Sequence, residues 1–167
     1  MILVLLGTQD KPFLRLLKMV SKEIDKGNIK EKVVAQTGYT AFSDKNMESF
    51  DFKSKDEIEK LIDKARIIIT HAGVGTITEC LEKGKKIIVV PRLKKYLEHT
   101  NDHQMQITKE FEMKGYVIAL YDKSRLSVAL KKIKTFKPKR YESNSENFKM
   151  KIKDYIEQYP DSMAMMF

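Results

Sequence analysis

The sequence predicts an α/β fold with a doubly wound, mostly parallel sheet. Short runs that are apolar at every position, such as Ile67 to Ile69, alternate with amphipathic stretches. Strands of this kind belong to sheets that are covered on both faces, and alternation with helices favours parallel pairing. The 167 residues are enough to bury one core. A single sheet domain is therefore the simplest expectation.

The first elements follow directly from periodicity. Residues 2–6 are expected to form a buried strand because they are apolar without interruption. A helix is expected over 12–24, where apolar residues recur at helical spacing. Residues 32–36 read as the second strand, and 47–52 as a short third strand after a polar loop.

The middle of the chain carries a helix-start signal. Ser54 is followed three residues later by Glu57, which is a capping-box pattern for a helix over 54–65. A strand is expected at 66–70 and a helix at 76–83. A strand ended by a proline is expected at 86–90, and a helix closed by a glycine at 102–114. A last strand is expected at 116–120 and a last helix at 124–133.

The character of the chain changes after residue 135. Residues 137–140 are a basic, proline-containing stretch, and 144–159 has its apolar residues on one helical stripe. We therefore divide the chain into a ligand-binding domain, residues 1–135, and a basic linker with a C-terminal helix and tail, residues 136–167.

Composition narrows the classes of partner and compartment. The net charge of +9 is compatible with nucleic acid, an anionic membrane surface or an anionic substrate. No RNA- or DNA-binding motif accompanies it, so no nucleic-acid partner is expected. No apolar run approaches the ~20 residues that span a bilayer. The single cysteine, Cys80, cannot form an internal disulfide, and a cytoplasmic location is expected.

The most informative segment is residues 70–79. Gly73 and Gly75 stand between a buried strand and a helix start, where a glycine lets the backbone approach a ligand. The first amides of a helix have no intrahelical partner and attract anions. Glu79 lies one turn further on and is placed to bind a hydroxyl group. A nucleotide or nucleotide-sugar fits both features.

Four loops at the carboxyl ends of the predicted strands hold most of the unusual residues, which predicts one site there. Four motifs stand in a recognisable order. They are Gly7-Thr8, His71-Ala72-Gly73-Val74-Gly75-Thr76 with Glu79, Val90-Pro91, and Glu98-His99 followed by Asp102-His103-Gln104. Together they resemble the carboxy-terminal half of GT-B glycosyltransferases of family 28, over about residues 1–122. The resemblance is to the free-standing, half-sized members.

The resemblance implies a Rossmann-like half of a GT-B enzyme. It implies inverting transfer of galactose, N-acetylglucosamine or glucuronic acid from a UDP-sugar to a polyprenyl-diphosphate-linked saccharide in polysaccharide biosynthesis. Members act on dolichol-linked sugars or, in bacterial capsule and exopolysaccharide synthesis, on undecaprenyl-linked sugars. They pair with a membrane-anchored second subunit, which would hold this chain at the inner face of the membrane.

The resemblance also assigns residues. The donor-binding positions that it implies are Gly7, Thr8, Gln36, Gly38, His71, Ala72, Gly73, Gly75, Thr76, Glu79, Asp102, His103 and Gln104. Glu98 and His99, at a loop tip, are the candidate catalytic residues that orient the acceptor, although the base can come from the partner. Neither a metal nor a cofactor is expected. A metal site within 98–103 is the rival interpretation, because two histidines and two carboxylates lie there.

Two other functions stay open at this point. The chain can be a non-catalytic subunit that keeps the UDP-sugar pocket while its partner does the chemistry. It can also be an unrelated nucleotide-binding Rossmann protein. The NAD fingerprint needs three glycines after the first strand, and Gly7 stands alone there.

Overall fold

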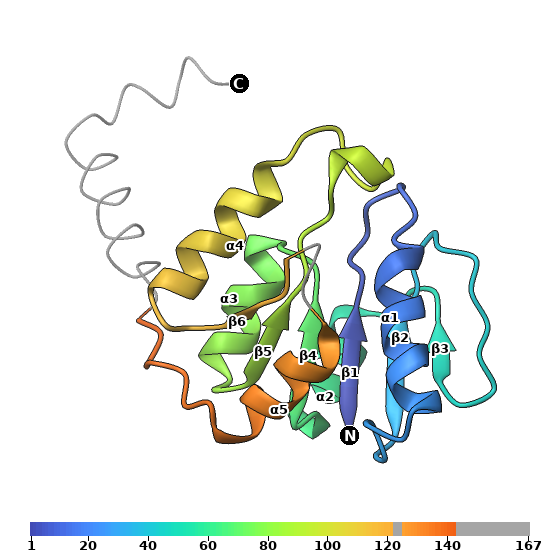
Figure 1. Ribbon diagram of the computed structural model, residues 1–167, viewed down its shortest axis with the longest axis horizontal. Helices are drawn as coiled ribbons and strands as arrows, with labels where there is room; N and C mark the ends of the chain where they lie inside the picture. The colour runs from blue at the N-terminus through green and yellow to red at the C-terminus, as the bar shows by residue number, and fades with distance from the viewer. Residues whose placement is uncertain (122–124, 143–167) are drawn as a thin grey trace, which may run out of the picture.

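The computed structural model describes residues 1–121 and 125–142. It contains a six-stranded sheet in which every pairing is parallel, with the strand order β3-β2-β1-β4-β5-β6 (Figure 1). The strands are β1 (Ile2–Leu5), β2 (Val33–Gln36), β3 (Glu48–Phe50), β4 (Ile67–Thr70), β5 (Lys86–Val89) and β6 (Ile118–Ala119). The helices are α1 (Leu14–Asp25), α2 (Lys55–Lys64), α3 (Val74–Glu82), α4 (His103–Met113) and α5 (Leu126–Thr135), with a 3-10 turn, η1 (Lys94–Tyr96).

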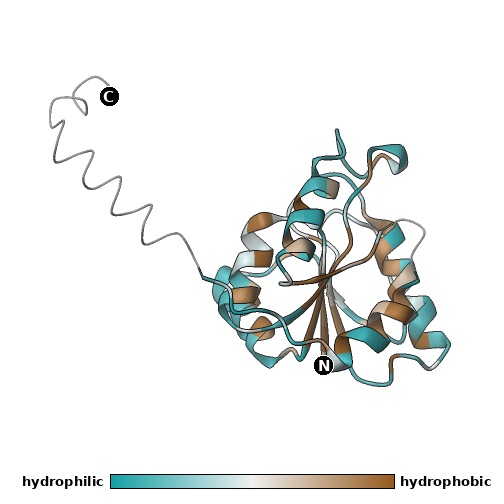
Figure 2. Ribbon diagram, turned by 60° about the vertical axis from the view of Figure 1, so that its left-hand side comes forward, coloured by the Kyte–Doolittle hydropathy of each residue, from teal (hydrophilic) through white to brown (hydrophobic). Residues whose placement is uncertain are grey.

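Helices cover both faces of the sheet, as the apolar strands predict. Successive strand residues point to opposite faces, so Val4 packs in the core layer under α1 and α5, and Leu3 packs in the layer under α2 and α3. The apolar strands run through the middle of the molecule between the two layers (Figure 2). The predicted doubly wound α/β architecture is therefore confirmed.

Cys80 belongs to the second of these layers and is fully buried. Burial, with a further contribution from the neighbouring Glu79 carboxylate, raises the pKa of the Cys80 thiol to about 12. The thiol therefore stays protonated at physiological pH and packs as a small apolar side chain, since only the thiolate is reactive. Cys80 is therefore a small residue of the core.

The helix-start signal at Ser54 is confirmed in full. The Ser54 hydroxyl accepts from the backbone N–H of Glu57, and the Glu57 carboxylate accepts from the backbone N–H of Ser54 at 3.0 Å. The Glu57 carboxylate accepts hydrogen bonds from the backbone N–H and the hydroxyl of Ser54 and from Lys53. These bonds lower the pKa of Glu57 to about 2, because they stabilise the charged carboxylate. The capping box defines where α2 begins.

Several element boundaries differ from the predictions. Helix α3 begins at Val74, two residues before the expected start at Thr76, and Gly73 is its N-cap. Helix α1 begins at Leu14, because the backbone N–H of Phe13 donates to the Thr40 hydroxyl, outside the helix. Strand β6 is confined to two residues where five were expected, since it meets β5 only at two register pairs.

The described part of the predicted linker packs on the domain. Phe136 contacts the core layer of α1 and α5, and the N–H of Lys139 donates to the Gly115 carbonyl at 3.0 Å. The Tyr141 ring meets the Tyr116 ring edge-on. The predicted helix over 144–159 and the tail lie outside the described residues. Within residues 1–121 and 125–142, no helix has the length and apolarity needed to cross a bilayer.

Candidate functional site

The topology brings the predicted motifs to one edge. Parallel strands end on the same side of a sheet, so the loops after β1, β2, β4 and β5 are neighbours. The strand order reverses between β1 and β4, where Leu5 pairs with Thr70. The loops that follow these two strands begin near Gly7 and His71, and such a switch point is where open α/β sheets bind ligands.

The amino end of α3 is open. No side chain caps it, and the Val74 side chain is about half exposed. A Cβ built on Gly75 would meet no atom within 4 Å. The unpaired amides of the first turn therefore face accessible space, with the positive end of the helix dipole behind them. This arrangement can hold an anion. Thr76 lies inside this turn and does not cap the helix.

Gly73 has a packing role that the sequence did not predict. The ring of His71 lies between two glycines: a Cβ on Gly73 would come within 2.4 Å of its Nε2 atom, and one on Gly7 within 2.6 Å of its Cε1 atom. Gly7 also has a positive φ of 77°. The two glycines make room for this imidazole. Gly75 has no such neighbour, so it keeps the predicted close backbone approach to a ligand.

The His71 ring is neutral at physiological pH. Burial is the main cause that lowers its pKa, to about 4, and the Arg92 charge adds to the effect. The Thr70 hydroxyl donates to the Leu5 carbonyl and lies 3.3 Å from His71 Nδ1. A hydroxyl that has given its proton away can only accept, which assigns the ring proton to Nδ1. Nε2 is then an acceptor.

This depressed pKa predicts acid sensitivity. The unfolded chain takes up the proton more readily, so stability is lost as the pH falls from about 6.5 to about 4. The loss attributable to His71 is up to about 3 kcal/mol. Urea unfolding of wild type and His71→Asn across this range measures it, since Asn keeps a donor in place of Nδ1. The exposed His103→Asn is the control, and equal pH slopes for wild type and His71→Asn would contradict the assignment.

Glu79 has a carboxylate oxygen in need of a partner. Its Oε1 atom is buried and makes no hydrogen bond among the described residues. An unpaired buried acceptor costs about 1–3 kcal/mol, so such an atom points to a missing donor. Glu79 lies on α3, one turn beyond the open amides. A ligand hydroxyl beside a bound anion would supply that donor.

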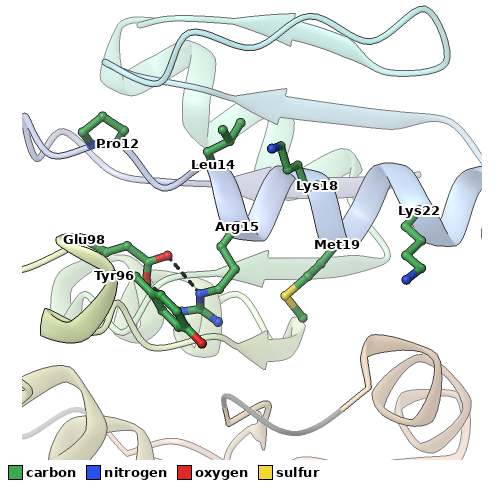
Figure 3. A pocket seen from close by; sticks show the side chains of 8 residues that line it. All are labelled: Pro12, Leu14, Arg15, Lys18, Met19, Lys22, Tyr96 and Glu98. Atoms are coloured by element: carbon green, nitrogen blue, oxygen red, sulfur yellow. Dashed lines mark hydrogen bonds and ion pairs between the residues drawn. The ribbon is translucent and has the colours of Figure 1, made fainter.

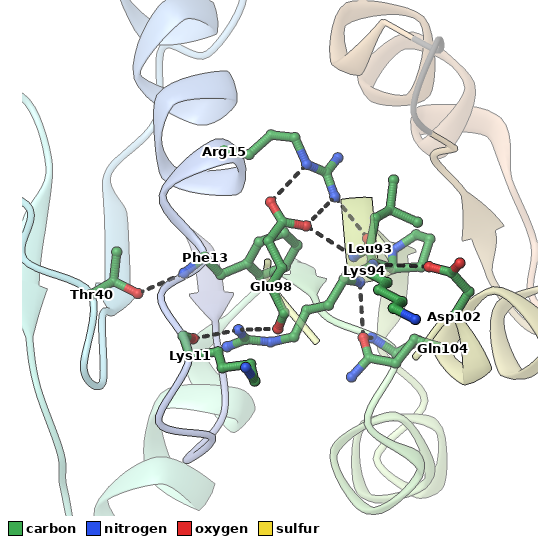
Figure 4. Close-up of polar contacts among 12 residues, drawn as sticks. Lys11, Phe13, Arg15, Thr40, Leu93, Lys94, Glu98, Asp102 and Gln104 are labelled. Carbon is green, nitrogen blue, oxygen red and sulfur yellow. Dashed lines mark hydrogen bonds and ion pairs between the residues drawn. The ribbon is translucent and has the colours of Figure 1, made fainter. Parts of the chain in front are cut away.

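Gln104 was expected to contact the donor. It is buried instead, and its amide oxygen is taken up by the backbone. Its Oε1 atom accepts from the backbone N–H of Ala72 at 3.1 Å and of Arg92 at 3.0 Å (Figure 4). It thereby joins the loop after β4 to the loop after β5. Gln104 positions the approach to α3.

The predicted placement of Glu98 at a loop tip is wrong. The residue is 3 % exposed, and its carboxylate receives two hydrogen bonds from Arg15, at 2.9 and 2.8 Å. It also accepts from the backbone N–H of Leu93 at 3.0 Å. Figure 4 shows Arg15 reaching across from α1 to this carboxylate. A carboxylate held in this way fixes the loop after β5 and is not free to orient an acceptor.

Arg92 is the residue that sequence reasoning missed. It is 1 % exposed, and its guanidinium donates to the carbonyl oxygens of Leu6, Lys11 and Glu98 while it lies 4.8 Å from the Phe13 ring centre. Burial lowers its pKa to about 10. Arg92 therefore ties the loop after β1 to the loop after β5. The available signal was a lone charge inside the apolar run 89–93.

The other predicted residues lie around this edge. Thr8 and His103 are exposed, and Asp102 accepts from the backbone N–H of Lys94 at 2.9 Å. His99 Nδ1 accepts from the backbone N–H of Asn101. Gln36 and Gly38 are buried at the end of β2, with Gly38 beside the Gly7 carbonyl. In the part of the chain that the structure describes, no three His, Cys, Asp or Glu side chains converge as metal ligands.

Two curated relatives match part of the chain. UDP-N-acetylglucosamine transferase subunit ALG13 of Homo sapiens is 36% identical over 66 residues, which are 40% of this chain and 6% of the human protein. The subunit of the same name from Candida albicans is 32% identical over 81 residues, or 48% of this chain and 26% of that protein. The chain thus spans only a minor part of the length of these two relatives.

Solved structures share the fold. An NMR structure of ALG13 superposes with a TM-score of 0.56 at 18% identity, over 89% of this chain and 93% of that chain. The crystal structure of MurG from Acinetobacter baumannii gives a TM-score of 0.53 at 18% identity, over 79% of this chain and 40% of that chain. These likenesses support the fold alone.

The glycosyltransferase family 28 C-terminal domain matches residues 1–159, which is nearly the whole chain. The match covers the open amino end of α3, Glu79 and the loops tied together by Arg92 and Gln104. The resemblance that the motifs indicated is confirmed: the chain belongs to the glycosyltransferase family 28 C-terminal domain family.

Proposed function

We propose that this chain is the donor-binding subunit of an inverting glycosyltransferase. It takes a sugar from a UDP-sugar and passes it to a polyprenyl-diphosphate-linked saccharide. The observation that carries the proposal is the buried, unpaired Oε1 of Glu79 one turn from the open amides of α3. A diphosphate at the amides, with its ribose hydroxyl donating to Glu79, satisfies both. The relatives named above favour UDP-N-acetylglucosamine over the galactose and glucuronic acid donors.

The proposed chemistry uses the amides of α3 to stabilise the departing UDP. Donors that point at developing charge in a fixed site are a large part of enzymatic rate enhancement. Oriented amides and the helix dipole do this in the proposal without a metal ion. The acceptor hydroxyl must also lose a proton. Glu98 is occupied by Arg15, so we assign the base to a second subunit.

That second subunit is proposed to be membrane-anchored and to bring the lipid-linked acceptor to this edge of the sheet. The relatives are themselves named as subunits. The surroundings of the site support the need for a partner, because the amino end of α3 and the Val74 side chain face outward. A second domain that closed over this edge would exclude water from the transfer.

Calorimetric titration with UDP, with ADP as a control, tests the donor class. Wild type is expected to bind UDP in preference to ADP. Glu79→Ala is expected to weaken UDP binding about tenfold to a hundredfold, because a hydrogen bond to a charged group is lost. Glu82→Ala, an exposed glutamate on the same helix, is the matched control and should bind like wild type. Preference for ADP, or equal UDP affinity of Glu79→Ala and wild type, would overturn the proposal.

A further inference from the structure

The turn between β5 and α4 projects two large hydrophobic side chains outward. Leu97 is 78% exposed, more than any other large hydrophobic side chain in the described residues, and Tyr96 is 48% exposed. Lys94 and Lys95 are exposed on the same turn. The turn therefore combines an aliphatic, an aromatic and two basic groups at one tip.

The backbone of this tip is held in a specific shape. Leu97 has a φ of 57°, the sole positive φ of a non-glycine residue among those described. A bulky residue adopts this conformation rarely and at an energetic cost. Hydrogen bonds close the turn, from Leu97 N–H to the Lys94 carbonyl and from Glu98 N–H to the Leu93 carbonyl. The buried Glu98 carboxylate, fixed by Arg15, anchors its base. The exposed leucine is thus presented by a rigid support.

A basic groove continues from the tip along α1. It has a volume of about 570 Å³ and runs between α1 and Tyr96, with Leu14 and Met19 in its lining (Figure 3). Lys18 and Lys22 stand along the same groove, and neither forms an ion pair with another described residue. We call the six residues Lys18, Lys22, Lys94, Lys95, Tyr96 and Leu97 the basic-apolar face.

Few negative charges lie near this face among the residues that the structure describes. Glu98 lines the groove, but its carboxylate is buried and paired with Arg15. Asp102 lies beside the tip, where one of its oxygens accepts from the backbone N–H of Lys94. Asp10 is exposed near the start of α1. The charge that Lys18 and Lys22 carry is therefore not paired by another described residue, and it borders exposed apolar groups.

We infer that the basic-apolar face docks directly on an anionic bilayer surface. Lysines around an aromatic and an aliphatic side chain match the interfacial zone of a membrane, where apolar groups enter and ammonium groups meet lipid phosphates. The turn follows β5, so it lies at the same edge of the sheet as the open amino end of α3. Docking here would bring the candidate site beside the lipid surface. The inference does not depend on which donor the site binds.

Vesicle co-sedimentation of the full chain tests the inference. Wild type should bind vesicles of phosphatidylcholine mixed with phosphatidylglycerol, and should not bind phosphatidylcholine alone. Added salt should weaken the binding. Leu97→Asn should lower the partition coefficient about tenfold, since one aliphatic side chain no longer enters the lipid. Asparagine tolerates a positive φ, so the turn is kept.

The charge contribution has a matched control. Lys18→Gln with Lys22→Gln should lower the partition coefficient by about tenfold or more, because two lysines near an anionic surface ordinarily strengthen binding by at least that factor. Lys60→Gln with Lys64→Gln removes the same charge at the same spacing from α2. This double variant should bind like wild type. Met113→Gln, which changes an exposed apolar residue on α4, is the separate control for Leu97→Asn and should also bind like wild type.

Residues 143–167 are identical in all these variants, so the differences report on the face alone. Equal binding of Leu97→Asn, Lys18→Gln/Lys22→Gln and wild type would overturn the inference. Failure of wild type to bind the mixed vesicles would overturn it as well. UDP titration of the same samples reports separately on the proposed donor site.

Discussion

Gly73→Ala is expected to destabilise the domain and to weaken UDP binding together. The new methyl group would lie 2.4 Å from His71 Nε2. The ring cannot yield easily, because Gly7 packs on its other side and Nδ1 is hydrogen-bonded to Thr70. Overpacking of this kind costs about 1–3 kcal/mol. Urea unfolding and UDP calorimetry on the same protein measure the two effects.

A double variant isolates the cause. If the imidazole is what Gly73 accommodates, His71→Ala/Gly73→Ala should be clearly more stable than the sum of the single changes predicts. Additive effects would contradict the placement of the His71 ring between Gly7 and Gly73. Gly75→Ala is the matched control for stability, because its Cβ would meet nothing within 4 Å. We expect Gly75→Ala to keep wild-type stability and still to reduce UDP affinity, since the methyl group enters the space assigned to the diphosphate.

Arg92→Met is expected to cost about 3–5 kcal/mol of folding free energy. A buried ion pair can sometimes be replaced by apolar residues without loss, because both partners leave together. Here the partners are the backbone carbonyls of Leu6, Lys11 and Glu98, which remain and lose their donor. Each unsatisfied buried group is worth about 1–3 kcal/mol. Equilibrium unfolding in urea measures the loss.

Arg125→Met is the control for this change, because Arg125 is exposed. It should shift the unfolding free energy by less than about 0.5 kcal/mol, as surface substitutions usually do. Arg92→Met should also weaken UDP binding, since Arg92 links the loops after β1 and β5. A loss below about 1 kcal/mol for Arg92→Met would show that the carbonyls find other donors, and that Arg92 does not hold these loops together.

The sheet could be predicted from sequence because its strands are apolar on both faces. Ile67 to Ile69 is such a run, and it forms β4 in the centre of the sheet. The extent of β6 could not be predicted, because it depends on where β5 offers partners, and these are Ile88 and Val89. The apolar residues of 116–120 led to a predicted strand that is longer than the segment that pairs with β5.

The site was predictable as a set of loops, but the use of individual side chains was not. Glu98 was expected at a loop tip, but its carboxylate is buried. Its partner Arg15 lies 83 positions earlier in the chain. Arg92 likewise reaches Leu6 across 86 positions. Local spacing carries no information about such pairs. Local spacing did predict that Glu79 lies one turn into a helix, because the helix start and Glu79 are close in the sequence.

Chemical-shift mapping tests the central claim that α3 holds the diphosphate. In a ¹⁵N-labelled sample titrated with UDP, we predict the largest changes at the amides of Gly73, Val74, Gly75 and Thr76, with smaller ones near Glu79. Uridine without phosphates should leave the first four nearly unmoved. If UDP instead perturbs amides at the opposite end of the sheet, around Asn28 and Arg66, or perturbs none, the donor site is not where we place it.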